Sequence, residues 1–149
     1  MSPTELFFYA GIAAGLVAFI FILTSRNETG SPLLAAMLSA GFAAYTAVQL
    51  WQEGPIMFWV NHSQNMTGIQ VWWDLIISVL IGLVFVAPRA RKVDMNVPLW
   101  GILVISTASI GLLAMIARLF WLENAQSGDK SEKASPPAPK QASPATNKA

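Results

Sequence analysis

Two charged residues lie inside otherwise apolar stretches of this sequence, where they could take part in proton-transfer chemistry. Asp74 follows Trp72 and Trp73 near the start of one apolar run, and Arg118 lies close to the end of a later one. A carboxyl group in a dry pocket walled by aromatics could act as acid or base, with a guanidinium orienting it. The alternative is a structural ion pair that only satisfies two charges in a low-dielectric place. We expect Asp74 and Arg118 to pair.

Further polar and aromatic residues could form a ligand site beside this pair. The residues expected to bind the ligand are Gln49, Glu53, Trp59, His62, Trp72 and Trp73. His62 is the sole histidine, and it is either a solvated residue, a proton carrier beside a carboxyl group, or an axial ligand to a pigment metal. One histidine excludes bis-histidine haem ligation within the chain, and the absence of cysteine excludes thiolate catalysis. The sequence therefore predicts no protein metal site and leaves any cofactor unknown.

The composition indicates that these residues are carried by a membrane protein. The chain has 149 residues, of which 54% are hydrophobic and 11% are charged. Soluble domains carry roughly 25% charged residues, so this chain has too few for a soluble surface. The formal net charge of +1 gives no reason to expect a nucleic-acid partner.

The apolar runs predict an all-α fold, an integral membrane four-helix bundle followed by a disordered tail. Leu6 to Ser25 is free of charge and long enough to cross about 30 Å of hydrocarbon. Ser31 followed by Pro32 is typical of a helix start. We expect a loop at the membrane surface at residues 52–68, a membrane domain at 1–123 with spans at about 6–25, 32–51, 69–87 and 99–121, and a disordered Ser/Pro/Ala/Lys tail at 124–149.

The positive charges favour one orientation of these spans in a bacterial inner (cytoplasmic) membrane. The two short connections carry Arg26, Arg89, Arg91 and Lys92, so they are expected in the cytoplasm and both termini outside. Ten aromatic residues then gather at the outer end, either as an interfacial belt or as the wall of a site for a flat ligand. They are Phe7, Phe8, Tyr9, Trp51, Phe58, Trp59, Trp72, Trp73, Phe120 and Trp121.

Small residues recur at helical spacing on two of the predicted spans. Such stripes allow helix backbones to approach closely, so they predict tight packing within one bundle or between copies of it. The stripes are Ala10, Ala14 and Ala18 on the first span and Ala35, Ser39, Ala43 and Ala47 on the second.

The run from Asn65 to Arg118 resembles a bacterial family of small four-helix membrane proteins of unknown function. The matching motifs are Trp73-Asp74-Leu75, the Arg89-Ala-Arg91 connection followed by Met95 and Trp100, and an Arg that closes the last helix after Ile110-Gly-Leu-Leu. More distantly, the pattern is similar to the plant and cyanobacterial neoxanthin-synthase-like family, small membrane proteins linked to carotenoid modification. The resemblance implies that Asp74 and Arg118 share a site and that the ligand is an isoprenoid.

Two functions are compatible with these observations. The first is a membrane protein that binds or modifies an isoprenoid or pigment, which leaves open whether it is an enzyme such as an isomerase or cyclase. The second is a non-catalytic accessory subunit that packs against a larger membrane complex, one that could contain pigment, through its small-residue stripes. The expected partners are membrane lipid, an isoprenoid or pigment ligand, and a larger complex or further copies of the chain.

Overall fold

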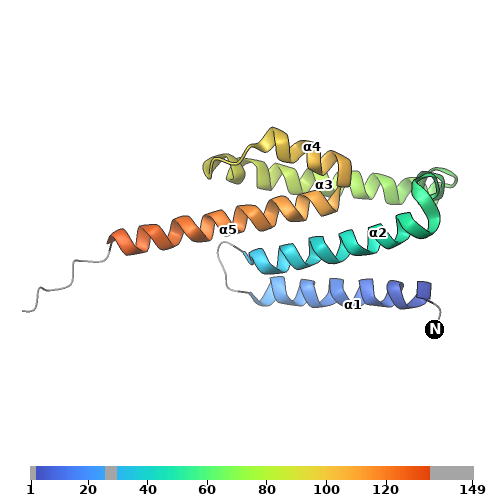
Figure 1. The fold of residues 1–149 in the computed structure, drawn as a ribbon, viewed down its shortest axis with the longest axis horizontal. Helices are drawn as coiled ribbons and strands as arrows, with labels where there is room; N and C mark the ends of the chain where they lie inside the picture. Colours follow the sequence, from blue (N-terminus) through green and yellow to red (C-terminus); the bar gives the residue numbers. More distant parts are fainter. Residues whose placement is uncertain (1–2, 26–29, 135–149) are drawn as a thin grey trace, which may run out of the picture.

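The computed structural model describes residues 3–25 and 30–134, and these residues form helices and no strand. The all-α class is therefore confirmed. Figure 1 shows the helices as a stack in which α2 lies between α1 and α5, with α3 and α4 on the far side of α5. The helices are α1 (Pro3–Thr24), α2 (Pro32–Ser63), α3 (Met66–Lys92), α4 (Val97–Thr107) and α5 (Ser109–Ala134). Arg26 and residues 135–149 of the predicted tail lie outside the described residues.

Three of these helices are long and apolar enough to cross a membrane. They contain the segments Glu5–Thr24, Pro32–Met57 and Met66–Lys92, which correspond to the first three predicted spans. The predicted cap of the second span is present, because the backbone N–H of Leu34 donates to Ser31 Oγ at 3.2 Å.

The fourth predicted span is not one helix. The chain reverses at Ala108 (φ 49°, ψ −118°), so α4 and α5 run in opposite directions from this turn (Figure 1). Thr107 Oγ1 bonds the Leu103 carbonyl at 2.7 Å, and a Cβ on Gly111 would come within 2.8 Å of the same carbonyl oxygen. The turn therefore depends on a glycine that lets α5 begin against the end of α4. The 11 residues of α4 extend only about 16 Å, which is half of a bilayer core.

The hydrophobic core lies where this helical hairpin packs on the second half of α3. Ala90, Met115 and Leu119 are fully buried there, and Val86 and Val104 nearly so. The guanidinium of Arg89 donates to the Glu123 carboxylate at 2.6 and 3.0 Å at the edge of this core. The core thus joins α3, α4 and α5 and leaves α1 out.

The two small-residue stripes differ in how closely they pack against other helices. On α2, Ala35 and Ser39 are buried, and the Ser39 hydroxyl donates to the Ile110 carbonyl of α5 at 2.9 Å. On α1, Ala18 is the single buried residue among the side chains that the structure describes. Close packing is therefore confirmed for the first half of the α2 stripe and is not found along α1.

The chain leaves the stack at the end opposite to the one where it enters. The start of α1 and the end of α5 lie at opposite ends in Figure 1, which differs from the same-side arrangement expected from four full spans. In addition, α5 continues to Ala134, so residues 124–134 are helical rather than disordered. The physical reason is that no proline occurs between Pro98 and residue 136, so the helix already begun in the core continues.

Candidate functional site: an aromatic pocket and an apolar groove

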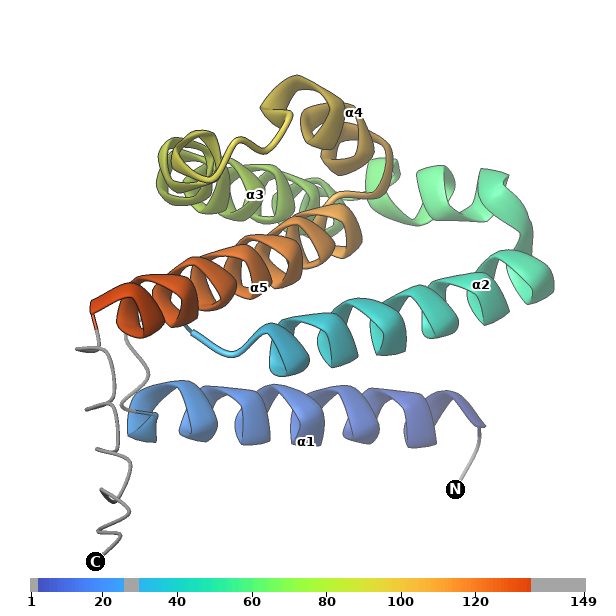
Figure 2. The same cartoon turned by 60° about the vertical axis from the view of Figure 1, so that its left-hand side comes forward.

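A kink in α2 forms the corner between α2 and α3 at which several of the predicted ligand-binding residues lie. Gly54 has φ 77°, a conformation that favours glycine, and Pro55 has no N–H to continue the helix. The last turns of α2 therefore bend away from its axis and lead across to α3 (Figure 2). The prediction of a surface loop at 52–68 is wrong for most of that segment, because the helix resumes after the kink and continues to Ser63.

The connection from α2 to α3 is short and closely packed. Asn65 caps α3, since its side-chain oxygen accepts the Gly68 backbone N–H at 2.7 Å. A Cβ on Gly68 would lie 2.7 Å from the Asn61 carbonyl oxygen and 3.2 Å from the His62 Cα. Only glycine therefore allows the first turn of α3 to approach the last turn of α2 this closely.

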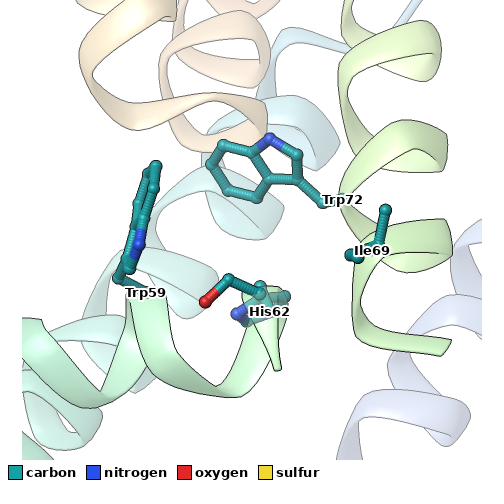
Figure 3. A pocket seen from close by; sticks show the side chains of 5 residues that line it. Trp59, His62, Ile69 and Trp72 are labelled. Atoms are coloured by element: carbon teal, nitrogen blue, oxygen red, sulfur yellow. The ribbon is translucent and has the colours of Figure 1, made fainter. Parts of the chain in front are cut away.

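This corner holds an aromatic pocket of about 180 Å³, lined by Trp59, His62, Ser63, Ile69 and Trp72 (Figure 3). The Trp59 and Trp72 rings meet edge to face, with centroids 6.4 Å apart and planes inclined by 67°. The His62 ring lies 6.1 Å from that of Trp72 with planes inclined by 57°. Three of the six predicted ligand-binding residues are thus brought together in one pocket.

The other predicted residues lie outside this pocket. Gln49 is half-buried on α2 before the kink and Glu53 is exposed next to it. Trp73 and Asp74 are exposed and line a shallow hollow on a different face of α3, together with Thr67 and Gln70. Successive residues of a helix are rotated by about 100°, so Asp74 points roughly away from the direction of Trp72. The predicted site is therefore divided between two faces of α3.

The predicted pair of Asp74 and Arg118 is not formed. Because the chain reverses at Ala108, α5 runs parallel to α3, with Leu112 against Gly82 and Glu123 bonded to Arg89. Arg118 therefore lies about 20 Å from the level of Asp74 along the stack. Its guanidinium lies 4.4 Å from the ring centroid of Trp121.

Because of the same reversal, the prediction that the ten aromatic residues gather at one end of the bundle is wrong. Phe120 and Trp121 lie at the end of the stack that holds Arg89, because the Arg89 guanidinium lies 5.2 Å from the Phe120 ring centroid. Aromatic residues thus occur at both ends of the stack, which is the pattern of an interfacial belt.

An apolar groove between α1 and α2 was missed by the sequence analysis. It has a volume of about 590 Å³ and meets a second hollow of about 330 Å³ at Leu38 and Leu113. Phe7 and Tyr45, with ring centroids 5.5 Å apart, lie at one end, and Phe21 and Ser25 line the other. The signal was the small-residue stripe of α1, whose alanines and the glycines beside it leave space along α2. The lining residues of the groove are Phe7, Ala10, Gly11, Ala14, Gly15, Met37, Leu38, Gly41, Phe42, Ala44, Tyr45, Val48 and Leu113.

Within the residues that the structure describes, no group of three or more histidine, aspartate or glutamate side chains could hold a metal ion. Comparison of the chain with protein-family models, with curated proteins and with solved structures finds no match.

Proposed function

We propose that this chain is an integral protein of a bacterial inner membrane that binds an elongated apolar ligand of the isoprenoid type between α1 and α2. The observation that carries the proposal is the groove itself, because its volume of about 590 Å³ lies in the range of ordinary ligand sites, about 300–1,000 Å³. From Phe7 to Ser25 the two connected hollows follow α1 for about 27 Å, which suits a long and narrow molecule.

The chemistry of the lining supports binding rather than reaction. Apart from Tyr45, every residue that lines the groove has an apolar side chain or none, so no carboxylate, histidine, lysine or arginine faces the space. An extended hydrocarbon needs no polar partner, and within a membrane van der Waals packing against the lining side chains stabilises it there. The isoprenoid class of the ligand comes from the distant resemblance carried by residues 65–118, of which Leu113 lines the groove.

The exposed surface supports a membrane location. Along α1 the aliphatic and aromatic side chains are exposed almost throughout, with Val17 at 66% and Leu23 at 67%. Contact with lipid is favourable for an apolar surface of this extent, whereas contact with water is unfavourable. The positive-inside rule favours the orientation with Arg89, Arg91 and Lys92 in the cytoplasm. The end of α5 lies at the same end of the stack, so it is cytoplasmic as well, and the start of α1 faces outward.

A matched pair of substitutions tests the groove. Ala14 lines it, whereas Ala13 on the same helix does not. The chain and its two variants, Ala14→Leu and Ala13→Leu, are purified in a mild detergent, and the apolar molecules that copurify are extracted and measured by mass spectrometry. We expect Ala14→Leu to reduce the bound isoprenoid-type ligand several-fold and Ala13→Leu to leave it unchanged. A preparation without bound ligand, or equal effects of the two variants, would refute the proposal.

One observation favours a second candidate, an accessory subunit of a larger membrane complex. Trp51 is 91% exposed and α1 buries only Ala18 among its described side chains, so a neighbour's helix could lie against α1. Native mass spectrometry from mild detergent separates the two functions. A chain released alone or as a homodimer argues against the accessory role.

A further inference from the structure

We propose that the aromatic pocket at the α2–α3 corner binds a quaternary ammonium group. Trp59, His62 and Trp72 present three rings whose planes are inclined to one another by 67° and 57° for the two measured pairs. The centroid separations are 6.4 Å for Trp59 and Trp72 and 6.1 Å for His62 and Trp72, so a cation between the two rings of either pair lies within about 6 Å of both centroids, the range in which a ring face attracts positive charge. Figure 3 shows the rings of Trp59 and Trp72 on two sides of the space beside His62, with the face of the Trp59 ring toward that space.

The charge distribution at this end of the molecule suits a cation. Neither lysine nor arginine occurs among residues 1–25 or 27–88, so the segments that lead to the pocket carry no permanent positive side chain. Glu53 and Asp74 lie on the two helices that form the corner, and both are exposed. Two carboxylates without a neighbouring Lys or Arg give this end of the molecule a negative potential, which raises the local concentration of cations.

The lining selects a methylated ammonium over a primary one. A primary ammonium is strongly hydrated and needs hydrogen-bond acceptors when it leaves water. Among the lining side chains, the indole N–H groups of Trp59 and Trp72 only donate, which leaves Ser63 and His62 as acceptors. A quaternary ammonium has no N–H, so it leaves no hydrogen-bond donor unsatisfied there. The pocket volume of about 180 Å³ also suits a compact head group better than a chain.

This inference is independent of the function proposed for the groove, because the pocket and the groove share no lining residue. The quaternary ammonium can belong to the choline head group of a membrane lipid or to a free solute. Loss of binding in the pocket and loss of ligand from the groove are therefore separate results.

Tetramethylammonium is the direct probe. Its binding to the full chain, held in phosphatidylglycerol nanodiscs, is measured by saturation-transfer NMR of the methyl signal, with sodium at equal ionic strength as the blank. We expect Trp72→Leu to weaken binding by about five-fold or more, because it removes the ring that contacts both others. Trp73→Leu is the matched control, since Trp73 is 63% exposed on another face of α3 and should stay within about two-fold.

Two further measurements keep the inference refutable. Trp59→Leu changes a side chain that is already 68% exposed, so it should weaken binding while leaving the helical circular dichroism unchanged. Neopentanol, a neutral molecule of similar shape, should bind at least about five-fold more weakly than tetramethylammonium if ring faces attract the charge. Equal binding of neopentanol, an equal loss in Trp73→Leu, or no binding of tetramethylammonium would overturn the inference.

Nanodiscs of a second composition distinguish the two sources. If phosphatidylcholine in the nanodisc displaces tetramethylammonium and phosphatidylglycerol does not, the pocket takes the lipid head group. If both lipids leave the binding unchanged, the pocket takes a free quaternary ammonium from solution.

Discussion

The direction of α5 can be tested with cysteine pairs, for which this chain is suited because it contains no native cysteine. In the structure Gly82 faces Leu112, and a Cβ on Gly82 would lie 3.5 Å from Leu112 Cγ, close to the position of a sulfur at 112. A disulfide needs Cα atoms about 4.4–6.8 Å apart, which this close contact permits. We expect Gly82→Cys/Leu112→Cys to form a disulfide on mild oxidation in membranes.

The opposing pair is Asp74→Cys/Arg118→Cys, which would join only if residues 99–121 formed one span antiparallel to α3. Leu112 lies level with Gly82, so Arg118 lies about 9 Å beyond that level and Asp74 about 12 Å before it. The resulting separation of about 21 Å is three times what a disulfide can bridge. We therefore expect no cross-link in this pair.

Cleavage at methionine by cyanogen bromide gives the readout for both pairs. Cleavage at Met95 separates α3 from the later helices, so the two fragments that carry the cysteines stay joined only through a disulfide. Mass spectrometry without reductant should find joined fragments for the 82/112 pair and free ones for the 74/118 pair. The opposite result would refute the hairpin and restore the continuous fourth span.

Three further predictions concern stability, measured as the free energy of unfolding in mixed detergent micelles. Gly30→Ala should lower the free energy of unfolding by about 2 kcal/mol or more, because Gly30 has φ 89° and packs against an aromatic ring. Gly101→Ala, in open space on α4, should instead raise it by about 0.5–1 kcal/mol. Ala108→Gly should gain about 1 kcal/mol, since it relieves a positive φ at the hairpin turn, and an unchanged midpoint would contradict the strain. Glu123→Gln should cost about 1 kcal/mol, a modest loss because its partner Arg89 is 41% exposed; a stabilised variant would show that the pair contributes nothing.

The sequence predicted those elements whose signals are local. Apolar length alone predicted the three helices that are long enough to cross a membrane, and Ser31 with Pro32 marked the start of α2 as the structure has it. The aromatic pocket was partly predictable as well, because Trp59, His62 and Trp72 lie close in sequence to one helix connection. The sequence predicted one site for Trp72, Trp73 and Asp74, but the helical rotation of about 100° per residue puts Trp73 and Asp74 on another face of α3.

The hairpin escaped prediction because hydropathy cannot distinguish one span from two half-length helices. Its signals were present but weak: three hydroxyl residues and a glycine occur between residues 106 and 111. Ser106 and Thr107 bond carbonyls four residues earlier at 2.8 and 2.7 Å, a contact that bends helices only slightly. The decisive contribution is tertiary, since the reversal lets Leu112, Met115 and Leu119 become buried between α3 and α4.

The hairpin also accounts for the groove. In an antiparallel four-helix bundle each helix contacts two neighbours, so a fourth full span would have packed against α1 as well as α3. Here α5 takes its place on the other side of α2, where Ser39 bonds Ile110, and α1 keeps a single neighbour (Figure 1). Leu113 of α5 still reaches the point where the two hollows meet, so α5 forms part of the groove floor. The same chain reversal that separates Arg118 from Asp74 therefore leaves the small residues of α1 facing open space, and the candidate ligand site moves from a buried ion pair to an uncharged groove.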